Sequence, residues 1–148
     1  MEQTIRRETT PVHLWIVGLL GLVWNGFGGY DYVMTQTDPV NYLATMGLGQ
    51  ESVDYMRTFP AWLTVFWALG VWGSLAGSIL LLLRSRHALT AFAVSLGAFV
   101  VSQVAELVMP RPVEMDTPAM WGTVAFIAVA LVGQLLYARR QSAVGVLR

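Results

Sequence analysis

Residues 24–32 read Trp24-Asn25-Gly26-Phe27-Gly28-Gly29-Tyr30-Asp31-Tyr32 and close a long apolar run that begins at His13. The stretch places an amide, a carboxylate and three glycines where a membrane helix would leave the bilayer. Polar side chains in or near hydrocarbon are costly and are usually kept for a function. The stretch therefore predicts a first membrane-spanning helix with a candidate polar site near one of its ends.

Composition extends this prediction to the whole chain. Of its 148 residues, 55% are hydrophobic and 12% are charged, about half the charged share of a soluble domain. The apolar residues gather in four runs, each close to the roughly 20 residues that cross a bilayer. We predict an all-α fold, in which residues 1–148 form a single integral-membrane domain built as an antiparallel four-helix transmembrane bundle.

Start and stop signals set the expected bounds of the helices. Thr10-Pro11, Asp38-Pro39 and Thr117-Pro118 each place proline directly after an N-cap residue, a pattern typical of helix starts. The segment 38–58 is too short in its helical parts to span, so we expect short interfacial helices there, between spans one and two. The predicted spans are 11–34, 60–83, 88–109 and 118–137.

Arginines divide unevenly between the two sides of the predicted bundle. The N-terminal tail, the loop between spans two and three and the C-terminal tail hold Arg6, Arg7, Arg84, Arg86, Arg139, Arg140 and Arg148. The other two loops hold Arg57 and Arg111 together with five acids. The positive-inside rule therefore predicts that both termini are cytoplasmic. The first run lacks a small-residue cleavage site, so we expect a retained helix in a bacterial inner membrane.

Small residues predict how the first two spans pack. Lipid gives apolar side chains little reason to prefer one another, so helices associate where small residues allow their backbones to approach. We expect the small-residue face of span one to meet that of span two. The residues on these faces are Gly18, Gly21 and Gly29 on span one, and Gly70, Gly73 and Gly77 on span two.

The candidate ligand-binding set is Trp24, Asn25, Asp31, Gln103 and Glu106. Asp31 and Glu106 lie at a similar depth near the same surface, where they either share a proton or separately reach headgroup water. Asn25 and Asp31 point about 120° apart on a regular helix, so both reach one ligand only if the glycines between them break the helix. Gln103 and Glu106 predict either a polar cavity wall or hydrogen bonds between helices.

Several kinds of chemistry are excluded by the residues themselves. The chain has no cysteine and no lysine, which removes disulfides, thiolate sites and Schiff bases. Its two histidines, His13 and His87, lie at span ends, where an interfacial position is expected rather than haem ligation. We expect no metal site, no cofactor and no nucleic-acid partner. A catalytic role would rest on Asp31 or Glu106 as general acid or base, so a non-enzymatic protein is favoured.

Parts of the chain resemble a family of small four-helix inner-membrane proteins of proteobacteria. The similar stretches are 24–29, Asp31-Tyr32-Val33-Met34-Thr35-Gln36-Thr37, Phe59-Pro60-Ala61-Trp62 and 68–84, so the resemblance covers spans one and two far better than spans three and four. Automatic labels sometimes call members of this family sugar transporters. The resemblance implies the fold and the location, and it lends slight weight to transport.

Three classes of function stay open at this point. The most specific is a small-solute binding or transport component with an outward-facing polar site. The second is an accessory or assembly subunit of a larger membrane complex, docked through its glycine faces. The third is an intramembrane enzyme acting on a lipophilic substrate. The expected partners are the lipid bilayer and either further copies of the chain or a larger membrane complex.

Overall fold

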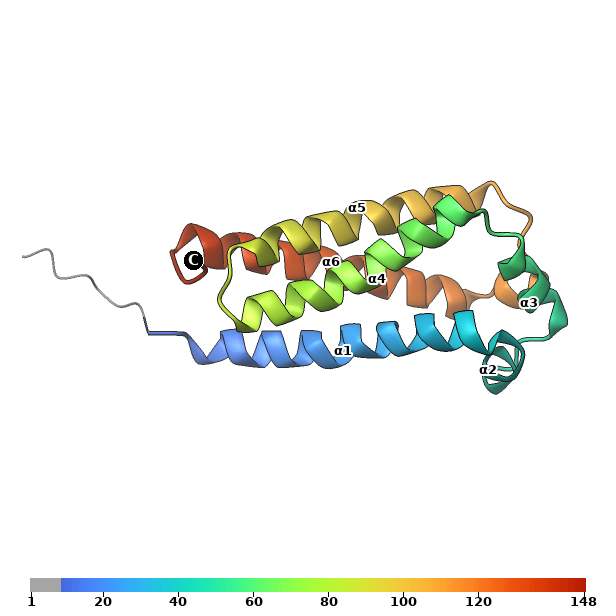
Figure 1. Ribbon diagram of the computed structural model, residues 1–148, viewed down its shortest axis with the longest axis horizontal. Helices are drawn as coiled ribbons and strands as arrows, with labels where there is room; N and C mark the ends of the chain where they lie inside the picture. Colours follow the sequence, from blue (N-terminus) through green and yellow to red (C-terminus); the bar gives the residue numbers. More distant parts are fainter. Residues whose placement is uncertain (1–8) are drawn as a thin grey trace, which may run out of the picture.

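The computed structural model describes residues 9–148, so Arg6 and Arg7 of the orientation argument lie outside the described residues. Four of the helices are long and apolar enough to cross a membrane, and short helices follow the first of them (Figure 1). The predicted all-α four-helix bundle is confirmed, and its exposed apolar surface suits a multi-pass membrane protein in contact with lipid. The elements are α1 (Val12–Thr37), α2 (Pro39–Thr45), α3 (Gln50–Arg57), α4 (Ala61–Leu82), α5 (His87–Leu107), the 3-10 turn η1 (Val113–Met115) and α6 (Pro118–Ala143).

The first and last spans are longer than predicted. α1 continues to Thr37 and α6 to Ala143. The added turns of α6 contain Arg139, Arg140 and Gln141, which have good helix propensity. Thr117 caps α6 as expected, its hydroxyl accepting from the Met120 amide. The predicted cap at Thr10 is wrong: Pro11 is the N-cap residue of α1, and it offers no side-chain hydrogen bond.

The central helix of the arrangement is α4, which packs against α1 on one side and α5 on the other (Figure 1). α6 packs along α5 and meets α1 through side chains. The rings of Trp24 and Phe126 lie 4.9 Å apart in a T-shaped pair, and His13 contacts Tyr137. The bundle therefore closes between α1 and α6 by long side chains rather than by backbone approach.

The glycines of α4 do not face α1. Gly18 and Gly21 of α1 do lie against α4, next to Leu82 and Ser78. Gly77 instead faces Phe92 of α5, and a Cβ built there would lie 2.7 Å from its ring. Gly70 and Gly73 also face α5. The expectation that two glycine faces meet is therefore wrong: the glycines of α1 pack against α4, whereas the glycines of α4 pack against α5.

The two ends of the bundle differ in charge, and we name them accordingly. The acidic end carries α2, α3 and η1, which gather around a small apolar cluster of Leu43, Leu48 and Val53. The arginine-rich end carries the start of α1, the α4–α5 turn and the end of α6 (Figure 1). Its apolar cluster is larger and includes Leu14, Leu81, Ala88, Phe92, Ala138, Val146 and Leu147.

The segment after α6 covers the arginine-rich end. It turns back at Gly145, whose φ of +76° favours glycine, and buries Val146 beneath the helices. The backbone amide of Arg148 then donates to Arg84 O at 2.8 Å, and the amide of Arg86 donates to Arg148 O at 2.9 Å. This pairing holds the segment against the α4–α5 turn and gives one wall to the pocket described below.

Candidate functional site

A pocket of about 250 Å³ lies at the acidic end, where α5 ends and α6 begins. Glu106, Arg111, Asp116 and Trp121 supply its polar and aromatic lining, with Leu107 and Met109 completing the wall. The volume is slightly below the usual range for ligand pockets, which suits a small solute. Two carboxylates and one guanidinium leave the lining with one net negative charge.

Arg111 organises this pocket. Its Nη2 atom lies 3.3 Å from Glu106 Oε2, and its Cζ atom lies 4.6 Å from the ring centroid of Trp121. The indole Nε1 of Trp121 in turn donates to Asp116 Oδ1 at 2.7 Å. Stacking between a guanidinium and an indole, together with charge-assisted hydrogen bonds, fixes all four side chains relative to one another. The lining is therefore held in place before any ligand arrives.

Two buried hydroxyls lie close to this lining. Ser102 Oγ is buried and has no hydrogen-bond partner within the described residues, and Tyr55 Oη is buried near Glu106 and Arg111. Ser102 lies one helical turn before Glu106 on α5. Burial raises the pKa of the Tyr55 phenol, and the nearby negative charge of Glu106 raises it further. The hydroxyl of Tyr55 therefore stays protonated at neutral pH and remains able to donate a hydrogen bond.

Glu114 fastens η1 to α3 beside the pocket. Its carboxylate accepts hydrogen bonds from the Gly49 amide at 3.1 Å, the Ser52 amide at 3.0 Å and the Ser52 hydroxyl. Gly49 is the N-cap residue of α3, and a carboxylate is favoured at a helix N-terminus. The Ser52 hydroxyl, followed by the Gly49 amide, lowers the pKa of Glu114. This contact links the loop that carries Arg111 to the loop between α1 and α4.

Asp31 has its own partner, away from Glu106. The phenol of Tyr42, on α2, donates to Asp31 Oδ1 at 2.8 Å. Burial, and then the hydrogen bond to Asp31, raise the pKa of Tyr42 to about 12, so this donor keeps its proton well beyond neutral pH. No hydrogen bond joins Asp31 to Glu106 within residues 9–148, and each carboxylate instead contacts a different loop.

Asn25 is buried at the centre of the bundle. Its Nδ2 atom lies 2.8 Å from Ser78 Oγ, 3.1 Å from Ser74 O and 3.1 Å from Gln134 Oε1. These contacts join α1 to α4 and α6. α1 is continuous from Val12 to Thr37, so the glycines after Asn25 do not break the helix. Asn25 and Asp31 therefore act at separate places. Asn25 makes contacts between the long helices, whereas Asp31 accepts a hydrogen bond from Tyr42 of α2.

The five side chains of the predicted ligand set are thus divided over several places. Glu106 lines the pocket, and Gln103 lies beside it with Nε2 3.5 Å from Glu106 Oε1. Trp24 packs on Phe126, away from the pocket. Sequence reasoning missed Arg111, Asp116 and Trp121. The available signal was the single arginine of an otherwise acidic loop, followed closely by an aspartate and a tryptophan.

No protein-family model, curated protein or solved structure matches the chain.

Proposed function

We propose that this membrane protein binds a small polar solute in the pocket of Glu106, Arg111, Asp116 and Trp121. The observation that carries the proposal is the fixed arrangement of two carboxylates and a guanidinium around an indole, in a pocket of about 250 Å³. The net negative charge favours a neutral solute rich in hydroxyl groups, or a cation, over an anion. Carboxylates and guanidinium groups hydrogen-bond hydroxyls directly, and an aromatic face binds apolar or cationic parts.

The geometry supports binding of a solute. Passage of the solute through the bundle would also require the contacts between α1, α4 and α6 to open. Asn25 and its contacts to Ser78 and Gln134 occupy the region between α1, α4 and α6. A solute bound at Glu106 would have to displace these contacts in order to cross. The role that we propose for the chain is therefore that of a small-solute-binding component.

Calorimetric titration of the protein in lipid nanodiscs tests this role. Glucose serves as the neutral probe, ethanolamine as the cation and acetate as the anion. We expect heat from glucose or ethanolamine and none from acetate. Trp121→Phe removes the indole N–H that donates to Asp116, and Asp116→Asn removes one negative charge from the lining. Each should weaken binding about tenfold, equivalent to roughly 1.4 kcal/mol. Trp62→Phe, which changes a tryptophan outside this lining, should leave binding unchanged. An unaltered titration in the Trp121 and Asp116 variants would refute the site.

The orientation follows from charge, and the absence of cysteine makes it testable. We propose that the acidic end faces outward and the arginine-rich end faces the cytoplasm of a bacterial inner membrane. A single cysteine in place of Thr45, in α2, should react with a membrane-impermeant maleimide on intact spheroplasts. A cysteine in place of Ser85, in the α4–α5 turn, should react only after lysis. The reverse pattern would invert the orientation and put the solute pocket inside the cell.

A role as a subunit of a larger membrane assembly is the second candidate, and α6 favours it. Only Leu131, Ala138 and Gln141 of this helix are buried. A Cβ built at Gly122 or Gly133 meets no atom within 4 Å, so these positions would allow another helix to approach closely. Light scattering in mild detergent should then show an assembly larger than one chain, and Gly133→Leu should reduce it. Gly97→Leu, at an equally open glycine on α5, is the matched control.

A further inference from the structure

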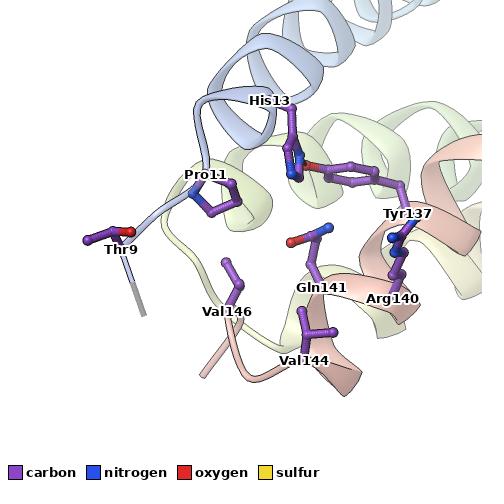
Figure 2. Close-up of a pocket in the computed structure, with 8 residues that line it drawn as sticks. All are labelled: Thr9, Pro11, His13, Tyr137, Arg140, Gln141, Val144 and Val146. Carbon is purple, nitrogen blue, oxygen red and sulfur yellow. Dashed lines mark hydrogen bonds between the residues drawn. The ribbon is translucent and has the colours of Figure 1, made fainter. Parts of the chain in front are cut away.

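A second and larger pocket opens at the arginine-rich end. Its volume is about 540 Å³, and it lies between the start of α1 and the end of α6 (Figure 2). His13, Tyr137, Arg140 and Gln141 give it a polar lining, while Val144 and Val146 of the C-terminal segment form its apolar wall. The pocket is formed at helix ends, where a bilayer crossed by the four long helices would place its lipid headgroups.

The polar lining offers hydrogen-bond donors. His13 Nδ1 lies 2.6 Å from the Tyr137 hydroxyl, and the two rings point toward each other in Figure 2. If the phenol donates to Nδ1, His13 keeps a free Nε2–H; if Nδ1–H donates, the phenol keeps a free O–H. One donor is therefore free in either tautomer. Gln141 is only 4% exposed, and within residues 9–148 no hydrogen bond holds its side-chain amide.

Within residues 9–148, the charged side chains at this end are all arginines. Residues 9–30, 55–105 and 117–148 contain no aspartate or glutamate, although they include Arg84, Arg86, Arg139, Arg140 and Arg148. Both ion pairs within the described residues, Arg57 with Asp54 and Arg111 with Glu106, belong to the acidic end. The described part of the chain thus supplies no carboxylate side chain for Arg140. An anion from outside would meet a guanidinium and at least two neutral donors.

We propose that this pocket binds a phosphate group. Phosphate accepts several hydrogen bonds at once and pairs strongly with a guanidinium, and basic pockets between membrane helices are suited to anionic lipid headgroups. Two sources share this chemistry: the headgroup of an anionic phospholipid and free inorganic phosphate. The site is separate from the solute pocket at the acidic end and does not depend on the function proposed for that pocket.

Lipid binding to the full chain in detergent is measured by native mass spectrometry, with phosphatidylglycerol as the anionic probe. Phosphatidylcholine, whose phosphate charge is balanced by choline, is the reference. We expect a preference for phosphatidylglycerol that falls about tenfold in Arg140→Gln, because a charge-assisted hydrogen bond is lost. Arg139→Gln removes the same charge one residue away, outside the pocket lining, and should lower binding about twofold or less. Gln141→Met keeps the side-chain length without the amide and should weaken binding severalfold.

A parallel calorimetric titration with inorganic phosphate separates the two sources. Binding of phosphatidylglycerol alone assigns the pocket to a lipid headgroup, and binding of inorganic phosphate with the same dependence on Arg140 assigns it to the free ion. Equal losses in Arg139→Gln and Arg140→Gln would reduce the effect to general surface charge and overturn the proposal. Absence of a preference for either probe would overturn it as well. Circular dichroism of each variant checks that the bundle remains folded.

Discussion

At the acidic end, Glu106, Glu114 and Asp116 each have a polar partner within the protein, whereas no ion pair involves the arginines of the arginine-rich end within residues 9–148. The apolar contacts show the opposite trend, because the larger buried cluster lies at the arginine-rich end and the smaller one under α2 and α3. The acidic end is therefore closed by directional hydrogen bonds between loops. The arginine-rich end is closed by its larger apolar cluster together with the backbone pairing of Arg148 with Arg84 and Arg86, and none of its arginines forms an ion pair within residues 9–148.

The largest expected effect comes from the packed end. Gly77→Ala would place a Cβ 2.7 Å from the ring of Phe92, a residue with no exposed surface. Overpacking of this kind costs about 1–3 kcal/mol. The measurement is unfolding in mixed micelles followed by circular dichroism. Gly97→Ala, where the added Cβ meets nothing within 4 Å, should be neutral or slightly stabilising. Equal stability of the two variants would show that close packing around Phe92 does not stabilise the arginine-rich end.

The second-largest effect is expected at Asn25, whose side chain joins α1 to α4 and α6. Asn25→Leu keeps the volume of the side chain but removes its hydrogen bonds to Ser74, Ser78 and Gln134. Hydrogen bonds between membrane helices contribute about 0.6 kcal/mol on average, so a loss of roughly 1–2 kcal/mol is expected in the same unfolding assay. Asn41→Leu, at an exposed asparagine on α2, should change stability far less. A neutral Asn25→Leu would mean that apolar packing alone joins α1 to α6.

A smaller, local effect is expected at Glu114. Because its pKa is lowered in the folded protein, its contact with α3 is present above the ordinary value of 4.5 and is lost as pH falls through the lowered pKa. Glu114→Gln should imitate this loss at neutral pH. Hydrogen exchange at the Gly49 and Ser52 amides should then rise severalfold, while exchange in α4 and α5 stays unchanged. Exchange that is insensitive to both acid and the substitution would show that α3 is held by its apolar cluster instead.

The smallest effect concerns Tyr42. Its pKa is raised from 10.0 to about 12, so the stability that its protonated form contributes is complete below pH 10 and is lost as pH rises through 12. Ultraviolet titration should show phenols that ionise late in the folded protein. Tyr42→Phe should lower the amplitude of this late step by one phenol, since the pKa of Tyr55 is raised as well. The same substitution should leave the stability of the bundle nearly unchanged. An amplitude of the late step that is unchanged in Tyr42→Phe would contradict the hydrogen bond to Asp31.

The helices were predictable because apolar runs and proline start signals depend only on local sequence. The start of α6 at Pro118 matches the prediction, and the short helices α2 and α3 lie within the predicted segment 38–58. The contacts of α4 were not predictable in the same way. Gly73 and Gly77 show that a close approach exists, but a glycine does not say which neighbour approaches it. That choice depends on how α1 and α5 are placed around α4.

The pocket lining was predictable only in part, for a related reason. Glu106 stood out because an acid near hydrocarbon is unusual. Arg111, Asp116 and Trp121 lie in or next to a loop where such residues are common, so only their mutual contacts mark them. The partners of Glu114 are separated from it by more than 60 positions, and no periodic pattern encodes such a pairing.

The unequal lengths of the helices have a consequence for the bilayer itself. α1 and α6 have 26 residues each, α4 has 22 and α5 has 21. At 1.5 Å per residue the long helices measure about 39 Å and the short ones about 32 Å, close to the roughly 30 Å of hydrocarbon. In a thinner bilayer the long helices would exceed the hydrocarbon thickness by more, and tilting of these helices would relieve that mismatch. Tilting of α1 relative to α5 would shift Asp31 and Tyr42 against Glu106, so membrane thickness would adjust the spacing of the loops around the solute pocket.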